Sequence, residues 1–169
     1  MIRRYHLLIA VLIVAVDRFT KWLVASRIAL HDSVNVIPGF FHITHVQNRG
    51  AAFGLWSDSP SEWKVTVLIM FSLAALMVVV ALLWKNSHAM TTTAAGLALI
   101  LGGALGNLWD RLAMGRVVDF LDFSVSGYHW PAFNLADSAI VIGALLLVGE
   151  ILFSKGTETA AEDELVSGR

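Results

Sequence analysis

The chain has 169 residues, of which 57% are hydrophobic and only 15% charged, and its formal net charge is −1. A soluble domain carries about a quarter charged residues, so this composition indicates a protein whose side chains are solvated largely by lipid. The near-neutral charge, with no basic run, argues against nucleic-acid binding, and the absence of cysteine excludes a thiol nucleophile, disulfides and thiolate metal sites.

Four apolar segments are long enough to cross a bilayer, which takes roughly 20 residues of helix. They cover residues 6–28, 64–84, 92–112 and 132–153. These segments predict an all-α membrane protein with four transmembrane helices in a single domain, residues 1–155. The polar and acidic remainder, residues 156–169, is typical of a disordered tail.

The first segment follows Arg3 and Arg4 and begins like a secretory signal. Its apolar run continues past Asp17-Arg18, and no small-residue cleavage site follows its first apolar core, so we interpret it as a retained membrane span. The third segment is rich in glycine, which suits close approach between helices in lipid.

The connection between the first two spans predicts a small β-sheet outside the membrane. Two short strands, residues 34–37 and 40–44, flank a turn at Pro38-Gly39. Further along, the segment 54–62 precedes the second span, and we consider it a candidate lid over a bound substrate.

The orientation of the spans depends on where the positive charges fall. Arg3, Arg4, Lys85 and Lys155 favour both termini inside, whereas an outer location for Arg49, Arg111 and Arg116 nearly balances that count. In this topology residues 29–63 and 111–130 share the outer side. Four tryptophans then lie near the outer interface, which indole rings prefer: Trp56, Trp63, Trp109 and Trp130.

Charged groups within apolar spans are costly and are therefore candidates for function. Asp17 and Lys21 lie four residues apart, hence on one helical face, and form either a structural ion pair or part of a site. Arg111, at the end of the third span, either reaches toward lipid headgroups or holds a catalytic carboxylate in place.

Two aspartates flank the connection between the third and fourth spans. Asp119 follows one span and Asp137 begins the next, so both emerge on the same side of the membrane whatever the orientation. If they approach closely, they share one proton, because neighbouring like charges resist joint ionisation. One carboxylate then activates water while its protonated partner polarises a peptide carbonyl, as in aspartic peptidases. The alternatives are two unrelated solvated aspartates, or Asp122 in place of Asp119.

Other patterns support competing functions less well. His42 and His45 form an H-x-x-H pair, but they lack a third ligand and a helical context, so they predict no zinc site. A proton-coupled carrier that uses Asp17, Asp119 and Asp137 as relays would need oligomerisation, because four spans without a repeat make a poor transporter. A non-enzymatic assembly factor, whose charges only hold helices together, is a third possibility.

Five sequence blocks resemble lipoprotein signal peptidase, also called signal peptidase II. They are D-R-F-T-K at residues 17–21, N-R-G-A-A-F at 48–53, G-G-A-L-G-N-L-W-D-R at 102–111, V-V-D-F at 117–120 and F-N-L-A-D at 133–137. The resemblance implies an aspartic endopeptidase of the bacterial inner membrane. It would cleave diacylglyceryl-modified prolipoproteins just before the lipidated cysteine, at the outer face, with both termini in the cytoplasm.

The resemblance also implies roles for individual residues. Asp119 and Asp137 match the catalytic pair, which favours Asp119 over Asp122. Six others match substrate-binding or supporting positions: Asn48, Gly50, Asn107, Asp110, Arg111 and Asn134. Asp17 and Lys21 match a structural or supporting motif.

The family fold comprises four membrane helices, a small extracytoplasmic sheet and a mobile outer loop. We expect no metal or cofactor, and a monomer surrounded by lipid. The first block commonly carries Gln where this chain has Arg18, which raises the question of how Asp17 is neutralised.

Overall fold

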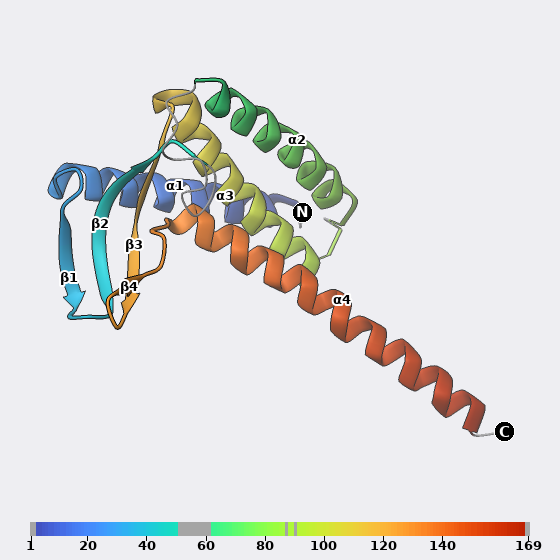
Figure 1. Cartoon of the computed structure of the whole chain (residues 1–169). Coiled ribbons are helices and arrows are strands. Elements are labelled where there is room, and N and C mark those ends of the chain that lie inside the picture. Colours follow the sequence, from blue (N-terminus) through green and yellow to red (C-terminus); the bar gives the residue numbers. More distant parts are fainter. Residues whose placement is uncertain (1–2, 51–61, 87, 90, 168–169) are drawn as a thin grey trace.

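The computed structural model describes residues 3–50, 62–86, 88–89 and 91–167. Its four helices are α1 (Arg3–Arg27), α2 (Glu62–Asn86), α3 (Thr92–Met114) and α4 (Leu135–Ser167). Helix α3 contacts each of the other three. Figure 1 shows α2 lying along α3, a sheet beside one end of the helices, and α4 extending away from that sheet toward the C-terminus.

The sheet has four antiparallel strands in the order β1-β2-β3-β4. They are β1 (Ser33–Ile37), β2 (Phe41–Asn48), β3 (Val117–Val125) and β4 (Tyr128–His129). The two strands predicted from the sequence are confirmed as β1 and β2, and Gly39 in the turn between them has a φ of +73° that favours glycine. Strands β3 and β4 were not predicted. They come from the connection between α3 and α4, so the small sheet that the sequence predicts is built from two of the interhelical connections.

Glycines allow α3 to approach its neighbours closely, as the sequence predicts. A Cβ atom on Gly96 would lie 2.8 Å from the carbonyl oxygen of Gly143 in α4, and one on Gly102 would lie 2.8 Å from that of Ala10 in α1. The helix begins at a capped end, where the Thr91 side chain accepts a 3.1 Å hydrogen bond from the Ala94 amide. It ends at Gly115, whose φ of +66° provides a left-handed cap.

Three helices in the described part of the chain are long and apolar enough to cross a membrane: Trp63–Asn86, Thr92–Met114 and Leu135–Phe153. Helix α1 falls outside this set, because Asp17, Arg18 and Lys21 interrupt its apolar sequence. Its outer face nevertheless exposes Leu8 and Val11. Large apolar side chains are exposed along all four helices, as expected of a surface that faces lipid rather than water.

Two further expectations concern the ends of α2 and α4. The candidate lid, residues 54–62, lies outside the described residues up to Glu62, where α2 begins. Helix α4 continues to Ser167, over residues for which the sequence predicts a disordered tail. The physical reason is local: no proline follows Phe153, and alanine and glutamate, common among these residues, favour helix.

Candidate active site

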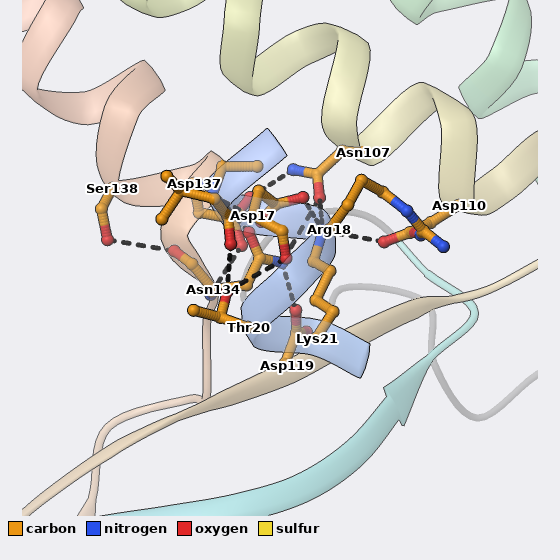
Figure 2. Close-up of polar contacts among 12 residues, drawn as sticks. Asp17, Arg18, Thr20, Lys21, Asn107, Asp110, Asp119, Asn134, Asp137 and Ser138 are labelled. Atoms are coloured by element: carbon orange, nitrogen blue, oxygen red, sulfur yellow. Dashed lines mark hydrogen bonds and ion pairs between the residues drawn. The ribbon is translucent and has the colours of Figure 1, made fainter. Parts of the chain in front are cut away.

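Asp119 and Asp137 meet in one hydrogen-bond network where the sheet joins the helices (Figure 2). Asp119 is in β3 and is 3% exposed, and Asp137 is in the first turn of α4. Asn134 joins them. Its side-chain amide donates a 2.7 Å hydrogen bond to Oδ1 of Asp119, and its backbone amide donates one of 3.2 Å to Oδ2 of Asp137.

The position of Asp137 follows from the way α4 begins. Oδ1 of Asn134 accepts a 2.9 Å hydrogen bond from the Asp137 amide, while the Asp137 carboxylate accepts from the Asn134 amide. This reciprocal arrangement is a capping box, with asparagine and aspartate at the usual positions three residues apart. The start of the helix therefore fixes the Asp137 carboxylate, and the partial positive charge of the helix N-terminus stabilises it as an anion.

A second amide supports the pair from α3. Asn107 donates from Nδ2 to Oδ1 of Asp137 at 2.8 Å, and its Oδ1 accepts a 3.0 Å hydrogen bond from Nζ of Lys21. Because the Lys21 ammonium can only donate, it fixes which end of the Asn107 amide faces Asp137. Lys21 in α1 is thereby connected to the aspartate pair through a single side chain.

The charged residues of α1 form a buried ion-pair network with α3. Lys21 lies 2.8 Å from Oδ2 of both Asp17 and Asp110, and Arg18 pairs with the opposite oxygen of Asp110. Lys21, not Arg18, neutralises Asp17, which answers the question raised by Arg18. The extra cation of this chain is balanced by Asp110 instead.

Asp17 also contacts the helix that carries the second aspartate of the pair. Its Oδ1 accepts a 3.0 Å hydrogen bond from the Ala136 amide, one of the free N–H groups in the first turn of α4. The same carboxylate therefore pairs with Lys21 and caps α4. A structural role for Asp17 and Lys21 accords with these contacts.

The environment of Asp119 changes its acidity. Burial, together with the charge of Asp137, raises the pKa of Asp119 to about 7. Hydrogen bonds from Asn48 at 3.0 Å and from Asn134 oppose this rise by stabilising the charged form. A carboxylic acid with such a pKa can hold a proton at neutral pH.

The remaining predicted residues line the same region. Gly50 donates its N–H to Oδ1 of Asn48 at 2.8 Å, and its carbonyl oxygen lies 3.4 Å from a guanidinium nitrogen of Arg111. Arg111 therefore reaches across to the end of β2. Of the two roles considered for it, these contacts favour holding the site over reaching toward headgroups.

Asp122 is absent from this network. It is three residues beyond Asp119 on β3, and alternate residues of a strand point to opposite faces. Its carboxylate contacts His129 at 2.9 Å instead. The structure therefore brings Asp119, and not Asp122, to Asp137.

An apolar pocket of about 320 Å³ adjoins the pair. It is lined by Trp130, Phe133, Asp137, Ser138, Val141 and Ile142. The sequence did not single out Trp130 or Phe133 as lining residues, because tertiary contacts bring this connection against β3: Trp130 donates its N–H to the Phe123 carbonyl oxygen, and Phe133 forms a bridge with Leu121. The pocket opens beside the helix face that exposes Val141 and Ile142, so an apolar group can approach Asp137 from that side.

The fold and the site define a membrane protein that carries two hydrogen-bonded aspartates at one end of its helices, Asp119 buried and Asp137 partly buried. Over residues 9–153 the chain matches the family model described as signal peptidase (SPase) II, and it belongs to this family. It is therefore a peptidase, and neither a carrier nor an assembly factor.

Two bacterial relatives match most of the chain. It is 50% identical over 147 residues to a lipoprotein signal peptidase of Solibacter usitatus, covering 87% of this chain and 90% of that protein. It is 42% identical over 150 residues to one of Francisella tularensis subsp. novicida, covering 89% and 92%. A bacterial membrane enzyme solved in meso at 2.3 Å superposes with a TM-score of 0.81 at 35% identity, covering 90% of both chains.

Proposed function

We propose that this chain removes the signal peptide from diacylglyceryl-modified prolipoproteins by cutting just before the lipidated cysteine. Membership of the signal peptidase II family and relatives called lipoprotein signal peptidases support this substrate class. The observation that carries the proposal is the shared hydrogen-bond network of Asp119 and Asp137.

In this proposal Asp119 and Asp137 are the catalytic pair and hold one proton between them. Asp119 carries that proton, in keeping with its raised pKa, and polarises the scissile carbonyl. Asp137, oriented by the capping interaction at the start of α4, takes a proton from the attacking water. Asn48, Asn107 and Asn134 keep the two carboxylates oriented through the transition state.

The charges around the pair support a single shared proton. Four carboxylates lie in or beside the network: Asp17, Asp110, Asp119 and Asp137. Three cations accompany them: Arg18, Lys21 and Arg111. One proton on the pair makes the buried group neutral, which is the favourable state where charges are poorly solvated.

The apolar pocket beside Asp137 supports a substrate that arrives through the lipid. A signal helix and its attached acyl chains can move laterally in the bilayer and reach the pocket from the exposed face of α4. The bond to be cut then lies at the level of the aspartates.

We assign α1 as the fourth membrane span. Its contacts with α3 advance in the same direction along both helices, from Ala10 beside Gly102 to Asp17 beside Gly106. A helix that runs parallel to a membrane span over this length crosses the same layer. Its charges face α3, and its apolar residues face outward.

The proposed orientation places both termini in the cytoplasm and the aspartate pair at the outer face of the inner membrane. Lys85 at the end of α2 and Arg4 at the start of α1 support an inner location for those ends. Trp63, Trp109 and Trp130 are exposed near the opposite ends of the helices, as expected at an interface.

Cleavage by purified full-length protein in lipid vesicles tests the proposal. A diacylglyceryl-modified precursor should be cut, and the same precursor without the lipid should be cut far more slowly. Asp119→Asn and Asp137→Asn should each abolish cleavage without loss of the folded protein. Asp32→Asn is the matched control, because this exposed aspartate lies in the connection before β1, away from the network.

The outcomes separate the parts of the proposal. Equal cleavage of both precursors would reject the lipid-modified substrate class but leave the catalytic pair in place. Wild-type activity in Asp119→Asn or in Asp137→Asn would show that these two aspartates are not the catalytic pair.

A further inference from the structure

Three side chains that could bind metal meet on the sheet, apart from the aspartate pair. His42 is on β2, Asp122 on β3 and His129 on β4, so neighbouring strands contribute one residue each. In the strand register His42 lies directly opposite Asp122. Nδ1 of His129 is 2.9 Å from both oxygens of Asp122, and Nδ1 of His42 is 3.9 Å from Oδ2.

The geometry of this cluster suits a small divalent cation. One ligand atom from each residue lies within 4.8 Å of the other two. Imidazole nitrogen and carboxylate oxygen bind zinc at about 2.0–2.2 Å, so modest side-chain rotations would close the three ligands around one ion. Two histidines and a carboxylate also leave a coordination position for water.

A second observation distinguishes this cluster from an ordinary histidine–aspartate hydrogen bond. His42 is only 9% exposed, and its Nδ1 has no hydrogen-bond partner among the described residues. The contact between His129 and Asp122 satisfies those two residues but leaves His42 facing the carboxylate beyond hydrogen-bond range. A bound cation would use the free nitrogen of His42 and the carboxylate together.

We propose that His42, Asp122 and His129 bind one zinc ion on the sheet. The pair of histidines considered from the sequence does not form, because Nδ1 of His45 instead contacts the Ile28 carbonyl oxygen at 2.8 Å. The zinc ion would tie β4 to β2 across β3. It takes no part in peptide cleavage, because Asp122 lies on the face of β3 opposite Asp119.

Zinc titration of tag-free full-length protein in detergent micelles, in competition with a chromogenic chelator, tests the proposal. The wild type should bind one equivalent and unfold at a higher temperature with zinc than without it. His42→Gln and His129→Gln should each weaken binding by at least the roughly 10–100-fold seen when an outer-shell partner is lost. A large excess of Mg²⁺ should not compete, because it prefers oxygen ligands.

His88→Gln is the matched control, since His88 is an exposed histidine in the connection between α2 and α3. It should retain wild-type zinc affinity. Because β4 is a two-residue edge strand, His129→Gln should keep the fold, which circular dichroism without zinc verifies. Absence of zinc binding by the wild type, or equal affinity in the His129 variant, would overturn the proposal.

Discussion

Oδ1 of Asp119 accepts a 2.7 Å hydrogen bond from Nδ2 of Asn134, a contact that connects β3 to the start of α4. Asn134 is fully buried and also caps the helix through its Oδ1. One side chain therefore sets the position of Asp137 and orients Asp119. This double role makes the two functions of Asn134 separable by substitution.

Asn134→Ser should reduce kcat/KM by roughly 10–100-fold while changing stability little. Serine caps helices as well as asparagine does, but its hydroxyl cannot cap Asp137 and reach Asp119 in the same way. Asp119 and Asp137 carry one negative charge between them, and a hydrogen bond to a charged group contributes about 1.5–3 kcal/mol. Asn134→Ala should lose similar activity and, in addition, about 0.5–2 kcal/mol of stability.

Kinetics and thermal unfolding of the two Asn134 variants provide the comparison. Equal unfolding temperatures for the serine and alanine variants would show that the side-chain cap at residue 134 contributes nothing to stability. Wild-type kcat/KM in the serine variant would show that the hydrogen bond from Asn134 to Asp119 does not assist cleavage.

The rate of cleavage should fall as pH rises above about 7. Burial raises the pKa of Asp119 to about 7, so a higher pH removes the shared proton and leaves both carboxylates ionised. Below this pKa the shared proton is retained, and the rate falls again only when the second carboxylate is protonated. The kcat/KM profile against pH measures both limbs.

Asn48→Ala should move the alkaline limb of that profile to higher pH. Nδ2 of Asn48 donates to Oδ2 of Asp119 and thereby favours the charged carboxylate. Without this donor the pKa of Asp119 rises further, because burial is less opposed. A limb that stays in place, or moves to lower pH, would contradict the assignment of this proton to Asp119.

Lys21→Met should destabilise the protein by about 3–5 kcal/mol, the usual cost of leaving a buried charge without its partner. Lys21 is 2% exposed and pairs with both Asp17 and Asp110. Arg18→Gln should cost much less, because the Arg18 side chain is 35% exposed and Asp110 retains Lys21. Thermal unfolding in micelles compares the two variants. An equal loss of stability would contradict the expectation that Lys21, rather than Arg18, contributes most of the stability of this ion-pair network.

Gly103→Ala should lower kcat/KM about 100-fold, the scale of loss that a 1 Å misplacement can cause. A Cβ atom at Gly103 would collide with the backbone carbonyl of Ala136, the residue before Asp137. Helix α4 must then move away from α3, and the carboxylate of Asp137, which we propose is catalytic, moves with it. The cleavage assay measures the loss.

Gly149→Ala is the matched control for the Gly103 variant. It lies further along α4 with open space around it, so an added methyl group meets nothing. This variant should retain wild-type activity. If both variants behaved alike, close packing of α3 on α4 would not be what positions Asp137.

Much of the helical architecture could be predicted from the sequence because it depends on local composition. Runs of about 20 apolar residues predicted helices that include the three candidate spans, and the glycines of α3 predicted its close packing. The turn at Gly39 marked the first two strands. Strand β3 was missed because V-V-D-F-L-D-F follows an apolar span and gives no clear alternation of its own.

The sequence by itself determined which residues are candidates, since charges in apolar surroundings and five motif blocks singled out Asp119 and Asp137. Only the tertiary structure decided how they are held. The pairing of Arg18 with Asp110 across 92 residues, and the bridge from Asn134 to Asp119, depend on packing between distant elements. Local patterns specify helices and strand faces, whereas contacts between elements arise only when all of them bury their surfaces together.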